Sequence, residues 1–300
     1  MDPHWTETEG SVIDPQADRP GAAQTRRDPQ RPFASAAVVG KGRLGSALAA
    51  ALTRSGIVSA DPSSAEVIFV AVPDDQIAQV AASVARQGVA LVHCSGVHGV
   101  DALRSASDRG AVTGAFHPLQ SFDRRGLPPE TFAGVTFAVW SSSDDLMSRL
   151  QALARLLGGR PESMADRGRA AYHLAATFAS NYLVVVLDLA RECLVEAGWS
   201  SDQAIAALLP LTRTTLEHVG QSGPGRALTG PVARGDVGTV AVHLDLLQVM
   251  RPGMGQAYVA LAAEALRLAR AAGQDQDRLA VIEASLQRFS GQGLAREATT

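Results

Sequence analysis

The chain has 300 residues, 46% of them hydrophobic, which is enough for about two domains with buried cores. Its formal net charge of -3 provides no excess of positive charge, so we expect neither nucleic acid nor a membrane among its partners. Its two cysteines are too few for a disulfide framework and lack metal-ligand spacing, so we expect no metal site and a cytoplasmic location.

Both ends of the chain are expected to be unstructured. Residues 1–34 are rich in Asp, Pro, Gln and Arg and contain no apolar run, which indicates a disordered tail rather than a signal peptide. Residues 291–300 are expected to form a second, flexible tail.

From residue 36, short apolar runs alternate with helical stretches. The runs cover residues 36–39, 67–72, 89–92, 112–116 and 135–140. This alternation is typical of a parallel α/β sheet, and a continuous run such as VIFVAV favours a strand covered by helices on both faces. We therefore predict an α/β domain over residues 35–163.

The second half of the chain is predicted to be helical. Helices are expected over residues 168–197, from Ser201 with a kink at Pro210, and over residues 236–250, 255–272 and 275–289. The most apolar window, residues 170–190, contains three polar residues that are costly in hydrocarbon, which favours a buried core helix over a membrane span. We predict an all-helical domain over residues 164–290.

The first strand leads directly into the glycine-rich sequence GKGRLG, residues 40–45, at the start of a helix. In such a turn the first amides of the helix face a pyrophosphate, and the glycines let it approach closely. A turn used only for tight packing is the alternative. We therefore predict a Rossmann-type dinucleotide domain. Its cofactor-binding residues are expected to be Gly40, Lys41, Gly42, Arg43, Leu44, Gly45, Val72 and Pro73.

Val72 and Pro73 belong to the sequence AVPDD, residues 71–75, at the carboxyl end of another predicted strand. Open α/β sheets bind ligands at this edge, so both residues are expected to line the cofactor cleft. Asp74 and Asp75, which follow them, are interpreted mainly as caps of the next helix.

Polar side chains follow two further strands, in VHCSG (residues 92–96) and FHPLQSF (residues 116–122). They are expected to meet at the same edge and form a reaction site. We assign His117 as the acid/base and Ser95 as the group that orients the reacting oxygen, with a structural role as the alternative for each. Gln120 and Ser121 are expected on the substrate side.

The helical half offers two further candidates. His173, Thr177 and Asn181 are spaced i, i+4 and i+8, so they form either a buried hydrogen-bonded stripe or a substrate-facing one. Arg234, in the turn TGPVARGD, is suited to hold a carboxylate or phosphate through two parallel hydrogen bonds, or else to pair with a local acid.

The motifs GKGRLG, AVPDD, VHCSG, FHPLQSF, ASNYLV and TGPVARGD occur in this order. With them the chain resembles, from residue 36 to about residue 273, a Rossmann-like family with a C-terminal domain of unknown function 2520. That family is similar to the superfamily of 6-phosphogluconate dehydrogenase, ketopantoate reductase and prephenate dehydrogenase. The resemblance implies that the helical domain binds substrate and forms a homodimer.

The resemblance also implies roles for single residues. Prephenate dehydrogenases carry a serine and a histidine-proline pair beside the nicotinamide, and Ser95 and His117 match these in order and position. The β-hydroxyacid dehydrogenases use KxxxN, where Asn181 fits the asparagine but Thr177 stands at the lysine position. His173 or His117 then replaces that lysine as the proton donor.

The segment between Arg54 and Glu66 is short. Its 11 residues are too few for the second strand and crossover helix that normally carry the adenosine-ribose ligand. We therefore interpret Asp61 as a loop residue. Discrimination between NAD and NADP is expected to be weak, with a tilt to NADP.

Together these features predict an NAD(P)-dependent oxidoreductase. It is expected to pass hydride between the nicotinamide and a small carbonyl or imine compound bound between the domains. The alternative, motivated by the short segment and the missing lysine, is a noncatalytic Rossmann protein that senses a nucleotide or acts in an assembly.

Overall fold

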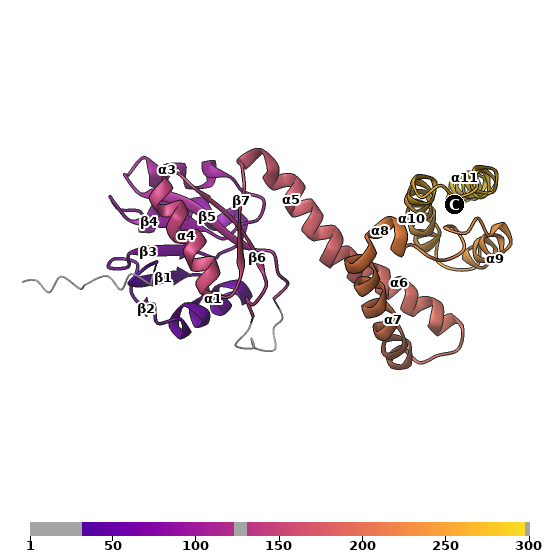
Figure 1. Cartoon of the computed structure of the whole chain (residues 1–300), viewed down its shortest axis with the longest axis horizontal. Helices are drawn as coiled ribbons and strands as arrows, with labels where there is room; N and C mark the ends of the chain where they lie inside the picture. The colour runs from indigo at the N-terminus through magenta and orange to yellow at the C-terminus, as the bar shows by residue number, and fades with distance from the viewer. Residues whose placement is uncertain (1–31, 123–130, 298–300) are drawn as a thin grey trace, which may run out of the picture. The chain divides into compact units, whose positions relative to one another are not determined.

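The computed structural model describes residues 32–122 and 131–297. The chain divides between Thr177 and Phe178 into two compact units, called unit 1 and unit 2 from here on. Unit 1 carries a β-sheet with helices, and the described part of unit 2 is helical (Figure 1). The predicted order, an α/β domain followed by a helical one, is therefore confirmed. The division falls inside a helical stretch, beyond the expected end of the first domain at residue 163.

Unit 1 is built on a seven-stranded sheet with the order β2-β1-β3-β4-β5-β6-β7. The strands are β1 (Ser35–Val39), β2 (Val58–Ser59), β3 (Val67–Val70), β4 (Ala90–His93), β5 (Val112–Pro118), β6 (Thr136–Ser141) and β7 (Arg160–Ser163). Strands β1 to β5 pair in parallel, as expected, whereas β6 runs antiparallel to β5. Strand β7 was not expected, because its sequence RPES is polar and mostly exposed and so carries no hydropathy signal.

The short segment after α1 (Arg43–Arg54) contains a strand after all, which corrects the sequence-based expectation. Strand β2 pairs only with Ser35 and Ala36 at the beginning of β1, and β3 starts opposite the same Ala36. The chain therefore moves sideways by two strand spacings, about 10 Å. Residues 60–66 span this distance with a turn and no helix. A crossover helix is not needed, because the end of β2 and the start of β3 lie at the same level of the sheet. Asp61 lies in this connection, as predicted.

Helices cover both faces of the sheet. The remaining helical elements of unit 1 are α2 (Ile77–Val84), α3 (Arg104–Ser107), α4 (Asp144–Leu156) and α5 (Arg169–Ala176), with the short helices η1 (Asp74–Gln76), η2 (Val100–Leu103) and η3 (Asp166–Gly168). One core packs α1 and α4 against Phe69, Phe116 and Phe137, and the other packs α2 and α3 against Ile68 and Leu91. Strand β3, whose four side chains are all buried, is the two-sided strand that its apolar run predicted.

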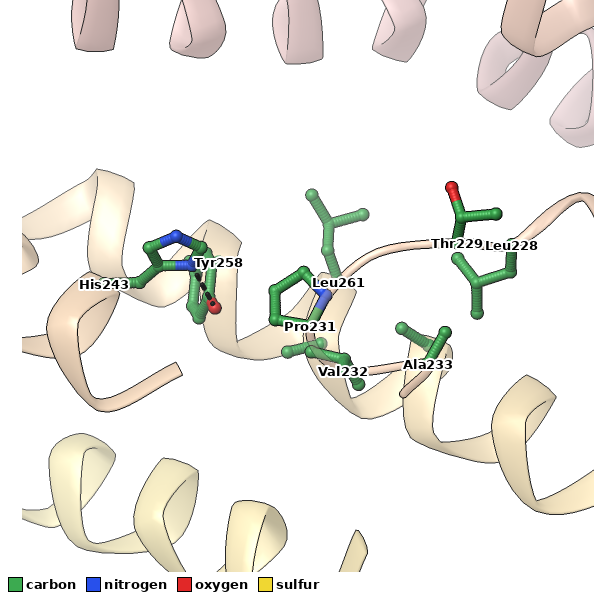
Figure 2. A pocket seen from close by; sticks show the side chains of 10 residues that line it. Leu228, Thr229, Pro231, Val232, Ala233, His243, Tyr258 and Leu261 are labelled. Carbon is green, nitrogen blue, oxygen red and sulfur yellow. Dashed lines mark hydrogen bonds between the residues drawn. The ribbon is translucent and has the colours of Figure 1, made fainter. Parts of the chain in front are cut away.

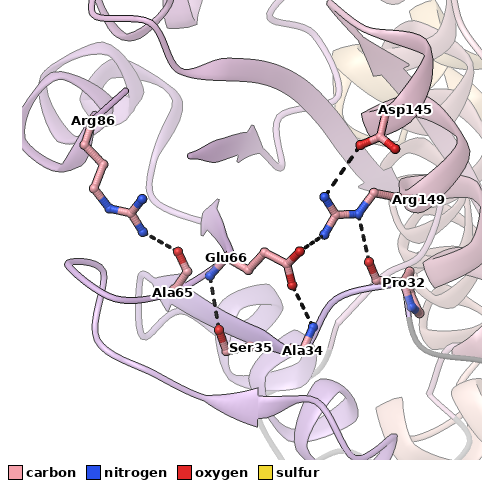
Figure 3. A network of polar contacts seen from close by, with 8 residues as sticks. All are labelled: Pro32, Ala34, Ser35, Ala65, Glu66, Arg86, Asp145 and Arg149. Atoms are coloured by element: carbon pink, nitrogen blue, oxygen red, sulfur yellow. Dashed lines mark hydrogen bonds and ion pairs between the residues drawn. The ribbon is translucent and has the colours of Figure 1, made fainter. Parts of the chain in front are cut away.

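The folded part of unit 1 begins before residue 35, where the expected tail was to end. Phe33 is buried, and the guanidinium of Arg149 lies 4.2 Å from its ring centroid. Arg149 also donates to the carbonyl of Pro32 (2.8 Å) and pairs with Glu66, whose carboxylate accepts from the amide of Ala34 at 2.8 Å (Figure 3). Residues 1–31 of the expected tail lie outside the described residues.

Unit 2 contains the helices expected from its periodicity and one further short helix at Pro224–Ala227 that was not expected. These are α6 (Leu183–Glu196), α7 (Ser201–Ser222, which runs through Pro210), α8 (Pro224–Ala227), α9 (Val237–Leu247), α10 (Pro252–Ala271) and α11 (Gln276–Glu297). Residues such as Val240, Leu266 and Ile282 form a core between α9, α10 and α11. Helix α11 continues to Glu297, so most of the expected flexible tail is helical, and residues 298–300 lie outside the described part.

The helical stretch Asp166–Glu196 is long and apolar enough, by length and composition, to cross a membrane. We expected a buried core helix here, but none of its most apolar window is buried in the single chain. Helix α7 packs against α6, but large side chains of the Asp166–Glu196 stretch stay exposed, among them Phe178 (61%) and Val184 (66%). The expectation of burial is therefore wrong for one copy of the chain.

Candidate active site

The strand register aligns the predicted site residues along one edge of the sheet. Val39, Val70, His93 and Ala115 lie side by side across β1, β3, β4 and β5. The segments that follow them therefore reach the same carboxyl edge of the sheet. They carry the glycine turn, the AVPDD sequence, Ser95 and His117, all within unit 1.

The three glycines of the turn have different surroundings. A Cβ atom on Gly40, which has a φ of +124°, would lie 2.1 Å from the Ala71 carbonyl oxygen, and one on Gly45 would lie 2.1 Å from the Gly40 oxygen. A Cβ on Gly42, the N-cap of α1, would have no atom within 4 Å. Packing alone explains Gly40 and Gly45 but not Gly42. The open space beside uncapped amides at a helix N-terminus fits a pyrophosphate.

The other predicted cofactor-binding residues of the turn differ in their exposure and contacts. Lys41 is exposed, whereas Arg43 donates to the carbonyl oxygen of Phe122 at 3.1 Å, in the segment after β5. Leu44 is half-buried and packs against the core. Of these residues, only Lys41 and Arg43 offer charge toward a phosphate.

Asp74 does not cap a helix, which corrects its main interpretation. Neither η1 nor α2 has a side-chain cap, and the Asp74 carboxylate lies 3.4 Å from Nδ1 of His98. The Ser95 hydroxyl lies 3.2 Å from the same Nδ1 and accepts from the backbone amides of Val97 and His98. Because Asp74 and Ser95 share one ring nitrogen, they do not form a relay of the Ser-His-Asp type. With its oxygen accepting from two amides, the Ser95 hydroxyl has a proton to donate, either to Nδ1 of His98 or to a bound ligand.

His93, the last residue of β4, is a fully buried imidazole. Its Nδ1 accepts from the Ser95 amide at 3.2 Å. Burial, followed by the positive charge of Arg169, lowers the pKa of His93 to about 4, so the ring is neutral at pH 7 and its proton is on Nε2. This Nε2 is buried and has no hydrogen-bond partner among the described residues.

His117 is paired with Tyr172, a residue of α5. Nδ1 of His117 lies 2.8 Å from the Tyr172 hydroxyl, and the two rings meet edge to face. Burial, followed by the charge of His173, lowers the pKa of His117 to about 4, and burial raises the pKa of Tyr172 to about 12. Both are neutral at pH 7. When the Tyr172 hydroxyl donates to Nδ1, rather than to the His117 carbonyl oxygen 3.5 Å away, the ring proton of His117 is on Nε2.

Gly96 is the point at which the histidines of the site meet. A Cβ at Gly96 would lie 3.0 Å from Nε2 of His117 and 3.2 Å from Cδ2 of His173. The structure therefore brings His117 and the exposed His173 together next to Ser95. The missing side chain of Gly96 lets these rings approach the backbone.

Gln120 and Ser121 are not brought to this cluster. Gln120 and Ser121 are exposed and bonded to each other, with the Gln120 side-chain oxygen accepting from the Ser121 amide. Asn181 is exposed and belongs to unit 2. The π-helix η4 (Thr177–Tyr182) interrupts the α-helical spacing between His173 and Asn181, so these residues do not form the predicted single stripe.

Three residues of the cluster were missed from the sequence. They are His98, Tyr172 and Arg169, which all contact or act electrostatically on the predicted residues. Tyr172 directly precedes His173, and Arg169 is spaced i, i+3 from Asp166. Both spacings are common in helices, so neither one identifies a site residue from the sequence. Among the described residues, no group of three or more His, Cys, Asp or Glu is arranged to hold a metal ion.

Unit 2 contains a separate pocket of about 250 Å³. Thr229, Pro231 and Val232 of the TGPVARGD turn line it, together with His243 and Tyr258, which form a hydrogen bond of 3.1 Å (Figure 2). Arg234, the predicted anion ligand of this turn, is exposed and does not line the pocket.

Comparison with known proteins agrees with this architecture. Residues 58–118 match the family model of a Rossmann-like domain, which defines the class of fold. Residues 135–265 match the model of the domain of unknown function DUF2520. Each model matches less than half of the chain, and the two matches follow one another in the order that the motifs indicated, so the resemblance drawn from the motifs is confirmed.

Solved structures share the fold at low sequence identity. A candidate NADP oxidoreductase from Bacteroides fragilis, BF3122, is 24% identical, with a TM-score of 0.66 over 78% of this chain and 98% of that chain. Protein TM1727 from Thermotoga maritima is 22% identical, with a TM-score of 0.64 over 80% and 100%. Plasmodium falciparum pyrroline carboxylate reductase with NADP bound is 12% identical, with a TM-score of 0.51 over 88% and 99%. No curated protein matches the sequence.

Proposed function

We propose that this protein is an NADP-dependent oxidoreductase that reduces a small carbonyl or imine compound. The observation that carries the proposal is the common sheet edge, where the glycine turn with its open Gly42 lies in register with Ser95 and His117. Two of the solved structures with this fold are described by NADP in their names, which agrees with the proposed cofactor.

The glycine turn and the N-terminus of α1 would hold the pyrophosphate, with Lys41 and Arg43 adding positive charge. Val72 is half-buried and Pro73 is exposed at the same edge, where both would line the nicotinamide side. When bound, the cofactor supplies the hydride.

The preference for NADP follows from the shortened second strand. Strand β2 ends level with Ala36, three residues and therefore about 10 Å short of Val39, after which the glycine turn begins. Asp61 is consequently not placed at the sheet edge, where an acidic residue would bind the free ribose of NAD. Asp61 is then not placed to repel the extra phosphate of NADP.

His117 is the proposed proton donor to the reduced oxygen or nitrogen. The Tyr172 hydroxyl at Nδ1 directs the proton of the neutral ring to Nε2, on the side of Gly96 and His173. As Nε2 gives up its proton, Nδ1 can take the proton of Tyr172, which keeps the ring neutral and leaves a Tyr172 phenolate that water reprotonates before the next turnover. The Ser95 hydroxyl, with a proton to donate, orients the same oxygen or nitrogen. His173 and Asn181 remain proposed substrate contacts.

We also propose that the protein is a cytoplasmic homodimer. The apolar side chains that α5, η4 and α6 leave exposed in one chain, among them Phe178 and Val184, would be covered by a second copy. Light scattering of the purified chain would test this proposal, and a monomer at micromolar concentration would contradict it.

The cofactor proposal is tested by titrating the protein with NADPH and with NADH while following nicotinamide fluorescence. We expect saturable binding of NADPH, with NADH binding equally or more weakly. A strong preference for NADH would contradict the reasoning from β2. No binding of either cofactor would favour the noncatalytic alternative.

A further inference from the structure

Arg169 is a buried arginine that uses only part of its hydrogen-bonding capacity. Its side chain is 3% exposed, and its Nε donates to Oδ1 of Asp166 at 2.8 Å. Within the described residues, its two terminal nitrogens have no hydrogen-bond partner. A guanidinium presents those nitrogens as a planar fork that matches a carboxylate.

Asp166 fixes the orientation of this fork without filling it. Its second oxygen, Oδ2, accepts from the amide of Val100 at 3.2 Å. A Cβ on Gly99 would lie 2.4 Å from the same oxygen, so the carboxylate is held tightly against the loop after β4. Asp166 therefore engages Arg169 from the Nε side and leaves the end of the guanidinium available.

A second unused donor lies in the same cluster. Nε2 of His93 is buried and unpartnered, which is costly when nothing binds there. Arg169 is the strongest charge acting on His93, and it acts on His117 and Tyr172 as well. The guanidinium thus belongs to the group of side chains that surrounds the proposed proton donor.

We infer that the terminal nitrogens of Arg169, together with Nε2 of His93, bind the carboxylate of an acidic substrate. This inference rests on the proposed function and narrows its substrate class to carbonyl or imine compounds that carry a carboxylate. It moves the anion-binding role from Arg234, which is exposed in unit 2, to an arginine of unit 1 whose charge acts on His117.

The test measures binding without turnover. The full chain is titrated with formate, pyruvate and benzoate, and with the matching neutral amides, while the ring signals of His93 and His117 are followed by NMR. We expect saturable binding of at least one carboxylate, at least tenfold tighter than its amide. Equal binding of acid and amide, or no binding of any carboxylate, would overturn the inference. Inorganic phosphate is the competing anion, and binding of phosphate alone would also overturn it.

Variants separate the site from a merely structural ion pair. Arg169→Met should weaken carboxylate binding at least tenfold, whereas Asp166→Asn, which keeps an oxygen that can accept from Nε of Arg169, should change it by less than tenfold. The double variant Asp166→Asn/Arg169→Met avoids an unpaired Asp166 if the single variant folds poorly, and it should bind as weakly as Arg169→Met. Arg234→Met is the matched control and should bind as the wild type does. A folded Arg169 variant with unchanged binding would contradict the inference.

The NADPH titration is run on the same variants. Lost carboxylate binding in Arg169→Met with retained NADPH binding is the expected result. Carboxylate binding without any NADPH binding would contradict the proposed function and leave this site intact. NADPH binding without carboxylate binding in the wild type would contradict this site alone.

Discussion

Alanine at each glycine of the GKGRLG turn should separate folding from cofactor binding. Gly42 has a φ of -70° and open space around its Cβ position, so Gly42→Ala introduces no clash. Alanine stabilises by about 0.4–1 kcal/mol through the unfolded state and loses a similar amount as a poorer N-cap. The free energy of unfolding should therefore stay within about 1 kcal/mol of wild type, while the methyl group obstructs the pyrophosphate.

Gly45 and Gly40 should behave in the opposite way. A Cβ on Gly45 would lie 2.1 Å from the Gly40 oxygen, more than 1 Å inside ordinary contact, and the resulting overpacking costs about 1–3 kcal/mol. Gly40→Ala adds the strain of a positive φ to an equally short approach to Ala71, so it should cost about 3 kcal/mol or more.

The assay combines urea unfolding, followed by circular dichroism, with NADPH titration of each folded variant. We expect Gly42→Ala to unfold like the wild type and to bind NADPH at least tenfold more weakly, which is about 1.4 kcal/mol. Gly42→Asp should bind more weakly still, because a carboxylate then faces the phosphates. Unchanged NADPH affinity in a stable Gly42→Asp variant would refute the role assigned to this turn.

His117→Ala should lower kcat by about 10² to 10⁴ without changing the Kd for NADPH. Tyr172→Phe should lower kcat less and shift the pH profile of kcat. An unchanged kcat in His117→Ala would exclude His117 as the proton donor. His93, whose pKa of about 4 lies below the ordinary 6.5, contributes stability that is complete above pH 6.5 and is lost as the pH falls toward 4. Urea unfolding at pH 7 and pH 4.5 should show a loss from this residue of up to about 3 kcal/mol, absent in His93→Phe, and equal losses in both proteins would contradict the shift. Asp61→Ala should change the Kd for NADPH and for NADH by less than tenfold, and a larger loss for NADH would make Asp61 a ribose ligand.

The sequence predicted the elements whose hydropathy is distinctive. Strands such as β3 are short apolar runs between helices, and their burial on both faces leaves a clear signal. Strand β7 is polar and mostly exposed, and β2 has only two exposed residues, so neither stands out from a loop. The antiparallel direction of β6 is likewise not encoded in hydropathy, because both directions bury the same side chains.

Only those residues of the candidate site that come directly at or after the end of a strand could be predicted from the sequence. Ser95 and His117 could be placed together because the carboxyl ends of parallel strands share one edge. Tyr172 and Arg169 lie on a helix more than fifty residues further along the chain. The hydrogen bond of Tyr172 to His117 and the electrostatic effect of Arg169 on His93 and His117 both depend on tertiary packing. The π-helix η4 could not be read from the i, i+4 spacing, which assumes regular α-helix.

The most direct test of the central claim is hydride transfer itself. The protein is incubated with NADPH deuterated at the transferred position and with a panel of 2-oxo acids, with and without amines, and products are analysed by mass spectrometry. We predict that one deuterium appears in a reduced product with the wild type, and that its rate of appearance falls by about 10² or more with His117→Ala. Saturable NADPH binding with no deuterium transferred to any carbonyl or imine acceptor would contradict the account.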